Sequence, residues 1–271
     1  MWHYAEKSFA KKVFAVFMMG FFVFTSPFGA ISQVFAREDS DKPFVAVLCY
    51  HHISDIETST GTDSNAVVPL SEFEEHMAYL YEQGYYTASQ GELQDFIYLN
   101  KPLPKKTVVI TFDDGYKSNY TNAFPVLKKY GFKATIFVIG ERIVEEEGEF
   151  EPGILPKLSY GEMKEMVESG LIEFGNHTFD AHTFDGAKPI LLNMSKGDIE
   201  EDFLRLEELF LKIGIPPFIS IAYPYGSFDR DVIDVVKKTK HKLGYTVKKG
   251  FVYQDSSPFT LNRLVITPGV S

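Results

Sequence analysis

Two adjacent acids end an apolar run that has the character of a buried strand. Residues 107–112 read Thr-Val-Val-Ile-Thr-Phe, and Asp113, Asp114 and Gly115 follow directly. Carboxylates in such a place are costly unless they face a polar cavity or a metal ion. In parallel α/β sheets, sites also form at the carboxyl ends of strands. An ordinary Asp-Gly turn, with Asp capping a helix, is the alternative.

Two histidines, His177 and His182, lie five residues apart in the next segment of interest. On a helix they would sit about 140° apart and face different sides, so they converge only if the segment is a loop. Such a pair is often incidental. Together with Asp114, however, it would form a His₂-carboxylate set with open positions, as in catalytic metal sites. Asp113 would then be free to act as a base.

The third segment is Ala222-Tyr223-Pro224-Tyr225-Gly226. Its proline and glycine fix an unusual backbone that could aim an N–H at a developing oxyanion. An ordinary strand-to-helix turn is again the alternative. All three segments follow predicted strands, which places them on one rim of a parallel sheet and favours an active site.

The elements that would position these residues alternate between strand and helix. Such alternation is typical of βα units around a parallel sheet, and the strand number suits a barrel better than a sandwich. A capping box of Ser71 and Glu74 is expected to open the first helix. Strands are predicted at 44–50, 107–112, 134–139, 171–174, 218–222, 244–247 and 264–266, helices at 71–83, 123–130, 159–169, 195–213 and 229–240, and an exposed loop at 53–65.

The N-terminal segment 1–36 has the pattern of a signal peptide. Lysines precede an apolar run at 13–24, which is shorter than the roughly 20 residues that span a bilayer, and cleavage is expected after Ala36. A retained anchor is the alternative. Residues 37–43 would then be a short linker, and residues 44–271 the folded domain.

The composition of the chain limits the classes of partner that it can bind. The whole chain has a net charge of −10; because residues 1–36 carry three Lys and one Glu, the remainder has −12. This acidity argues against nucleic acid as a partner and tolerates a polymer that becomes cationic. Cys49 is the only cysteine, which excludes an intrachain disulfide and suggests a small core residue.

The three segments together resemble the first three motifs of the polysaccharide deacetylases (NodB homology domain, carbohydrate esterase family 4). The resemblance covers roughly residues 44–267. The His-to-His spacing and the opening run Cys49-Tyr50-His51-His52-Ile53 are similar to those of biofilm poly-β-1,6-N-acetylglucosamine deacetylases. The family resemblance implies a distorted (β/α)₇ barrel and the removal of N-acetyl groups from an extracellular, N-acetylated polysaccharide.

The resemblance also implies residue roles. Asp114, His177 and His182 would hold one divalent ion, expected to be zinc. Asp113 would deprotonate water at the metal, and the Tyr225 N–H would stabilise the oxyanion. The residues expected to contact the substrate are Tyr116, Pro224, Gly226 and Arg263.

Two departures from the family pattern matter. Many members carry Arg two residues before the proline, paired with the base; here that position is Ala222, and Arg263 is a candidate substitute. The late Leu-x-x-His motif that supplies the general acid is also missing, and His241 is expected to be exposed at a helix end. His51, on the rim and on a side facing away from Asp113, is the candidate acid, with His52 turned to the other side. Shaping the pocket is the alternative role of His51.

Other functions stay open at this stage. Peptidoglycan or chitin oligomers could be the substrate of the same chemistry. A catalytically inactive polysaccharide-binding module and an amidohydrolase for a small non-sugar amide are further alternatives. The chain is expected to be monomeric, and association with the cell envelope is compatible with the N-terminal segment.

Overall fold

The computed structural model describes residues 42–55, 66–146 and 155–269. The predicted signal peptide at 1–36, its cleavage point, and most of the linker at 37–43 lie outside the described residues, as does most of the predicted loop at 53–65. Within the described ranges, no helix has the length and apolar character needed to cross a membrane.

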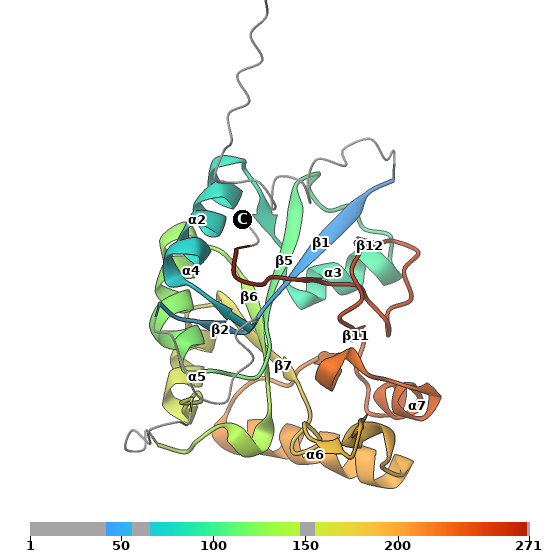
Figure 1. Cartoon of the computed structure of the whole chain (residues 1–271). Helices are drawn as coiled ribbons and strands as arrows, with labels where there is room; N and C mark the ends of the chain where they lie inside the picture. Colours follow the sequence, from blue (N-terminus) through green and yellow to red (C-terminus); the bar gives the residue numbers. More distant parts are fainter. Residues whose placement is uncertain (1–41, 56–65, 147–154, 270–271) are drawn as a thin grey trace, which may run out of the picture.

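A curled sheet forms the centre of the molecule (Figure 1). Neighbouring strands along the path β11-β10-β7-β6-β5-β1-β13 pair in parallel, while β4 pairs in parallel with the start of β5 and β12 pairs antiparallel with the start of β1. The strands of this sheet are β1 (Phe44–Tyr50), β4 (Tyr86–Thr87), β5 (Thr107–Phe112), β6 (Ala134–Val138), β7 (Ile172–Asn176), β10 (Ser220–Ala222), β11 (Leu243–Tyr245), β12 (Val252–Tyr253) and β13 (Leu264–Val265).

The sheet curls far enough for its two edges to meet through one segment. Tyr245 at the end of β11 forms a bridge with Leu261, and Leu264 of β13 pairs with Leu48 of β1. The seven parallel strands on this path match the distorted (β/α)₇ barrel that the resemblance implied. Two short ladders lie apart from the sheet: β2 (His52–Ile53) with β3 (Val67–Val68), and β8 (Phe184–Asp185) with β9 (Lys188–Pro189).

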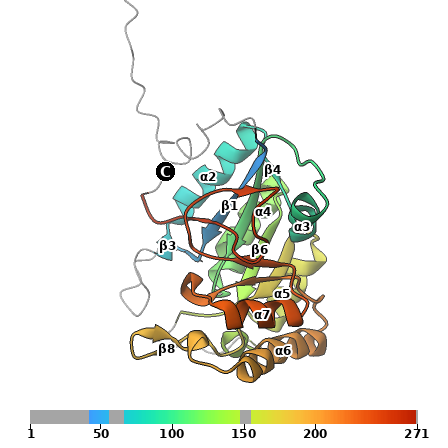
Figure 2. The same cartoon turned by 90° about the vertical axis from the view of Figure 1, so that its right-hand side faces the viewer.

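Of the helices in the described residues, five cover the outside of the sheet, while α3 packs against the cluster inside its curl. Figure 1 shows α2, α4 and α5 along one side and α6 and α7 around the lower part, and Figure 2 shows α3 on the opposite side from α2. The helices are α2 (Leu70–Glu82), α3 (Gln90–Tyr98), α4 (Phe124–Tyr130), α5 (Tyr160–Glu168), α6 (Lys196–Ile213) and α7 (Arg230–Lys238).

Side-chain alternation along β1 divides the core into two parts. Ala46, Leu48 and Tyr50 pack with the helices in the larger cluster, whereas Val45 and Val47 face the interior of the curled sheet. The odd-numbered positions of β1 therefore point into the barrel. This pattern positions the residues that follow β1 at the barrel mouth.

Several local predictions were wrong or incomplete. Helix α2 begins at Leu70 after Pro69, without a side-chain cap, so the predicted capping box at Ser71 and Glu74 does not form. Proline already fixes the backbone at the helix entry. The elements β2, β3, β4, α3, β8, β9 and β12 were not predicted, although the Ser89–Glu92 capping box of α3 was readable from the sequence.

Candidate active site

The three candidate segments meet at the carboxyl ends of β5, β7 and β10. Asp114, His177 and His182 each offer a ligand atom, and these atoms all lie within 4.8 Å of one another. The distance from Asp114 Oδ1 is 3.5 Å to His177 Nε2 and 3.3 Å to His182 Nε2. The structure therefore brings together the three residues that the sequence nominated as metal ligands.

Unusual backbone geometry concentrates in the same segments. Asp114, Thr178 and Tyr225 have φ values of 73°, 72° and 57°, in the left-handed region that non-glycine residues rarely adopt. Each such conformation costs of order 1–3 kcal/mol and persists where the surrounding structure enforces it. Glycine is required at position 175 of β7, two residues before His177, because a Cβ there would lie 2.4 Å from the Phe137 ring. Strain of this kind is typical of functional sites.

The orientation of His177 suits a metal ligand. Its Nδ1 lies 2.7 Å from the Ala222 carbonyl oxygen, which is a hydrogen-bond acceptor and therefore assigns the proton to Nδ1. Nε2, which faces Asp114, is left with a free lone pair. Two ligand atoms at about 2.05 Å from a tetrahedral zinc ion lie roughly 3.3 Å apart, close to the separations observed here. The ligand types and their separations thus fit a divalent ion that, like zinc, prefers tetrahedral coordination.

The protonation states also suit coordination. Burial lowers the pKa of His182 to about 3. Burial alone would raise the pKa of Asp114, but its interactions with His177 and the charge of Lys157 outweigh that effect and hold the pKa well below its usual range. At neutral pH the ligand set contains an ionised carboxylate and a neutral His182, the forms that bind metal.

Asp113 is fixed by a bidentate ion pair with Arg263. Arg263 Nη1 donates to Asp113 Oδ1 at 2.8 Å, and Nη2 donates to Oδ2 at 2.7 Å. Burial raises the pKa of Asp113, but the guanidinium charge and the hydrogen bonds from Arg263 bring it to about 2. The pairing proposed for Arg263 from the sequence is therefore present. Its expected contact with substrate is wrong, because the side chain has 0% exposure inside the barrel.

His51 lies beside Asp113, so the expectation that it faces away from the base is wrong. The register of the neighbouring strands explains this, since Tyr50 of β1 pairs with Phe112 of β5. His51 follows Tyr50 and Asp113 follows Phe112, so the two residues leave the sheet side by side. A ring nitrogen of His51, the Cys49 sulfur and an Asp113 oxygen lie within 4.8 Å of one another. The Cys49 thiol, kept protonated by burial, donates to Asp113 Oδ2 at 3.6 Å.

The loop between the two histidines is held by Asp202 of α6, a residue that sequence reasoning missed. Its buried carboxylate accepts hydrogen bonds from the consecutive backbone N–H groups of Phe179, Asp180 and Ala181 at 2.7, 2.8 and 3.2 Å. Three N–H groups on one carboxylate dictate the path of the chain between His177 and His182. A readable signal existed, because Asp202 falls on the apolar stripe of α6 with Ile199 and Leu206.

A second missed residue is Lys157, whose ammonium lies against the inner wall of the site. Its Nζ donates to the Asp114 carbonyl oxygen at 3.1 Å and lies 3.4 Å from the centre of the Tyr116 ring. Burial lowers the Lys157 pKa to about 8, against the opposing effect of Asp114. Burial and the nearby Asp114 carboxylate raise the pKa of Tyr116. Tyr116 therefore lies close to a candidate metal ligand, and its contact with substrate stays a prediction.

The turn after β10 presents Tyr225 at the surface. The Tyr225 side chain is 42% exposed, its hydroxyl donates to the His182 carbonyl oxygen at 3.2 Å, and its ring centre lies 4.6 Å from that of His182. Pro224 is buried, and Gly226 adopts a φ of 68° against Val247. Both shape this turn, while their contact with substrate stays a prediction.

Two further histidines have structural partners. His241 is 4% exposed and bonds Asn176 and Thr239, so its predicted exposure is wrong. Its ring is buried because it packs against Phe203 of α6 and Phe218, with ring centres 5.7 and 5.4 Å away. His52 bonds the Ser118 hydroxyl at 2.7 Å, whereas His51 lies beside Asp113, so the two consecutive rings point to different sides, as alternation predicted.

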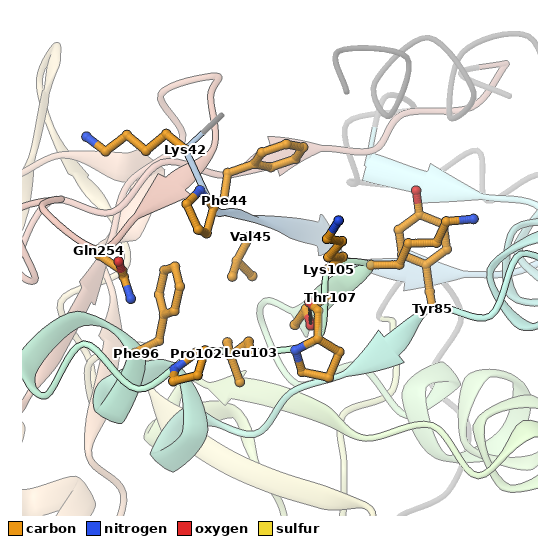
Figure 3. A pocket seen from close by; sticks show the side chains of 13 residues that line it. Lys42, Phe44, Val45, Tyr85, Phe96, Pro102, Leu103, Lys105, Thr107 and Gln254 are labelled. Atoms are coloured by element: carbon orange, nitrogen blue, oxygen red, sulfur yellow. Dashed lines mark hydrogen bonds between the residues drawn. The ribbon is translucent and has the colours of Figure 1, made fainter. Parts of the chain in front are cut away.

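A cavity of about 530 Å³ lies at the opposite ends of the strands. Its lining comes from the starts of β1 and β5 and the loop at 102–106, and Figure 3 shows Phe44, Phe96 and Tyr85 together with Lys42 and Lys105. None of the candidate catalytic residues lines it. The chemistry therefore belongs to the other end of the barrel.

Comparisons with known proteins agree with this site. The sequence profile of the family described as polysaccharide deacetylase matches residues 100–244. The Bacillus subtilis protein YxkH, whose name places it among polysaccharide deacetylases, is 34% identical over 88% of this chain and 80% of its own length. The poly-β-1,6-N-acetyl-D-glucosamine N-deacetylase of Staphylococcus aureus is 34% identical over 78% of this chain and 71% of its own.

Solved structures show the same fold. IcaB from Ammonifex degensii has a TM-score of 0.72 and 29% identity, covering 83% of this chain and 92% of its own. The Streptococcus pyogenes deacetylase PplD, solved in complex with acetate, has a TM-score of 0.69 and 27% identity, covering 83% and 93%. This chain belongs to the polysaccharide deacetylase family, hydrolases that act on N-acetyl amide bonds.

Proposed function

We propose that this chain is a metal-dependent enzyme that removes N-acetyl groups from an extracellular polysaccharide containing N-acetylglucosamine, with poly-β-1,6-N-acetylglucosamine as the leading substrate. The observation that carries the proposal is the buried Asp113–Arg263 pair next to the converging Asp114, His177 and His182. The identity with the Staphylococcus aureus deacetylase supports the choice of polymer.

One divalent ion, expected to be zinc, would be held by Asp114, His177 and His182. When bound, it would polarise the acetyl carbonyl and make an attacking water more acidic. The chain's own contribution is a set of ligands that is already aligned and mostly buried, with the His177 tautomer fixed by Ala222. The support is the donor geometry and the protonation states described above.

Asp113 is the proposed general base. Its low pKa, about 2, keeps the carboxylate ionised at neutral pH, ready to accept a proton from the attacking water. Arg263 occupies one lone-pair direction on each oxygen and the Cys49 thiol a second one on Oδ2, which leaves a lone pair of Oδ1 available. The ion pair thereby fixes the direction in which Asp113 presents this remaining lone pair.

His51 is the proposed general acid. The scissile amide cannot expel an amine anion at neutral pH, so a proton must reach the nitrogen. His51 Nδ1 is buried and has no hydrogen-bond partner among the described residues, while the residue itself is partly exposed at the barrel mouth. Its position beside Asp113 also allows the two groups to act on one substrate amide. Shaping the pocket is the competing role.

Tyr225 is the proposed source of an oxyanion-stabilising N–H. Its left-handed conformation turns the backbone sharply after β10, beside His182. The neighbouring amides of Tyr223 and Gly226 donate within the fold to Tyr245 and Tyr223. Removal of one such donor typically lowers the rate by about 10²–10³-fold.

The deciding experiment incubates metal-loaded protein with poly-β-1,6-N-acetylglucosamine, chitin oligomers and peptidoglycan in parallel and measures acetate release. The proposal expects the β-1,6-linked polymer to be preferred, and Asp113→Asn serves as the matched inactive control. Preference for peptidoglycan or chitin would move the proposal to that polymer. Binding of a polymer without acetate release would identify an inactive binding module instead.

Export is proposed from residues 1–36, whose basic start and short apolar run resemble a signal peptide. The secreted protein should then begin at Arg37, which N-terminal sequencing would test. Full-length chain in the membrane fraction would support the retained anchor and association with the cell envelope. The acidic surface fits a polymer that gains positive charge as acetyl groups are removed.

A further inference from the structure

We propose that the rings of Phe184 and Tyr225 form an aromatic ledge that binds a sugar ring of the polymer next to the acetamide being cleaved. This inference rests on the proposed function and names a binding subsite of the same active site. Phe184 belongs to none of the three motifs found in the sequence. Its position follows from the short hairpin of β8 and β9.

The ledge continues directly from the candidate metal ligands. The ring centres of His182 and Tyr225 are 4.6 Å apart, and those of Tyr225 and Phe184 are 4.3 Å apart. Both outer rings are open to solvent, with exposures of 42% for Tyr225 and 52% for Phe184. A substrate whose acetamide reaches His182 must therefore cover part of this surface.

The hairpin that carries Phe184 is well anchored. Phe184 pairs with Pro189 and Asp185 with Lys188, which leaves a two-residue turn that begins at Gly186 with a φ of 61°. At the base of the hairpin the Ile190 N–H donates to the Thr183 carbonyl oxygen at 2.9 Å, and near the turn Asn193 donates to Asp185 Oδ2 at 3.0 Å. The ring of Phe184 is thus held against Tyr225 before any ligand arrives, which lowers the entropic cost of binding.

The chemistry of the ledge selects its occupant. The faces of aromatic rings are electron-rich and apolar, and they pack well against the C–H face of a pyranose ring. The ledge contains no charged group of its own, so it suits a neutral sugar unit. Two rings in line would engage the unit adjacent to the cleaved one, which makes oligomers better ligands than the monosaccharide.

Substitutions of Phe184 distinguish stacking of its ring on a sugar from simple packing of its side chain against Tyr225. Phe184→Leu keeps an apolar side chain against Tyr225 but removes the ring face, whereas Phe184→Tyr keeps the ring. The Leu variant should raise KM for a β-1,6-linked pentamer about 3- to 10-fold, with kcat unchanged and the hydrolysis of a small activated acetyl ester unaffected. The Tyr variant should match the wild type.

The matched control is Tyr81→Leu, which removes another exposed ring, 59% exposed and packed 5.2 Å from the Tyr130 ring on α2's side of the molecule. This control should leave all constants unchanged. If Phe184→Leu keeps the wild-type KM for the pentamer, or lowers the ester rate as much as the pentamer rate, the ring only supports the turn and the ledge is refuted.

Binding measured without turnover keeps this inference separable from the proposed function. Pentamer Kd is compared between Asp113→Asn and Asp113→Asn combined with Phe184→Leu. A 3- to 10-fold weaker Kd in the double variant supports the ledge, and an equal Kd overturns it. Absence of acetate release from any polymer by the wild-type chain would overturn the proposed function on its own.

Discussion

Replacement of Arg263 by Met should lower the free energy of unfolding, because it leaves the buried Asp113 carboxylate without its partner. Arg263 is fully buried, the side chain of Asp113 is 4% exposed, and the two form two short hydrogen bonds. Met fills a similar apolar length but leaves Asp113 charged and unpaired. Removal of one partner of such a buried pair typically destabilises a protein by about 3–5 kcal/mol.

The assay is equilibrium unfolding by urea or heat. For a domain of this size each kcal/mol shifts Tm by about 2–4 °C, so Arg263→Met should lower Tm by roughly 6–20 °C. The double variant Asp113→Asn/Arg263→Met removes both charges and should recover most of that loss. Acetate release should be absent from both variants, because the base is mispositioned in one and missing in the other.

The double variant provides the refuting outcome. If its destabilisation equals the sum of the two single variants, the two residues do not interact and the ion pair is not what holds the base. Wild-type stability in Arg263→Met would contradict the account equally. A pH dependence follows too: the folded pKa of Asp113, about 2, lies below its ordinary value of 3.8. The pair's stabilisation is therefore complete above pH 4 and is lost as the pH falls toward 2.

Three further substitutions test separate parts of the site. Asp113→Asn should retain the metal and lose activity by about 10²–10⁴-fold; loss of the metal would mean that the two aspartates are assigned the wrong way round. His51→Ala should lower kcat, remove the alkaline limb of the pH–rate profile and spare an activated acetyl ester, and equal loss on ester and amide would exclude it as the acid. Asp202→Asn should weaken metal affinity about 10–100-fold, measured by competition with a chelator, whereas the buried-acid control Glu162→Gln should lower Tm without changing that affinity.

The rim of the barrel could be predicted because each candidate segment directly follows a recognisable strand. Asp114, His177 and Tyr225 are local to strand ends, and a parallel sheet gathers such ends on one side. The fold class followed from the same alternation of strands and helices. These features depend on short-range pattern alone.

Features that depend on register between distant strands could not be derived in the same way. The position of His51 beside Asp113 follows from the pairing of Tyr50 with Phe112, which no local pattern reveals. The two-residue strands other than β13 were missed because they are too short for periodicity to be seen. Asp202 lies 20 residues beyond His182, and only its place on an apolar helix stripe indicated a buried role.

Metal content and acetate release measured together test the central claim most directly. The wild-type chain is stripped of metal, titrated with zinc, and assayed at each step on poly-β-1,6-N-acetylglucosamine, with His177→Ala treated in parallel. We expect no acetate from the stripped chain, full activity at one equivalent of metal, and neither metal nor acetate with His177→Ala while its fold persists. Full activity of the thoroughly stripped chain, or tight metal binding by His177→Ala, would contradict a metal-dependent site at these residues.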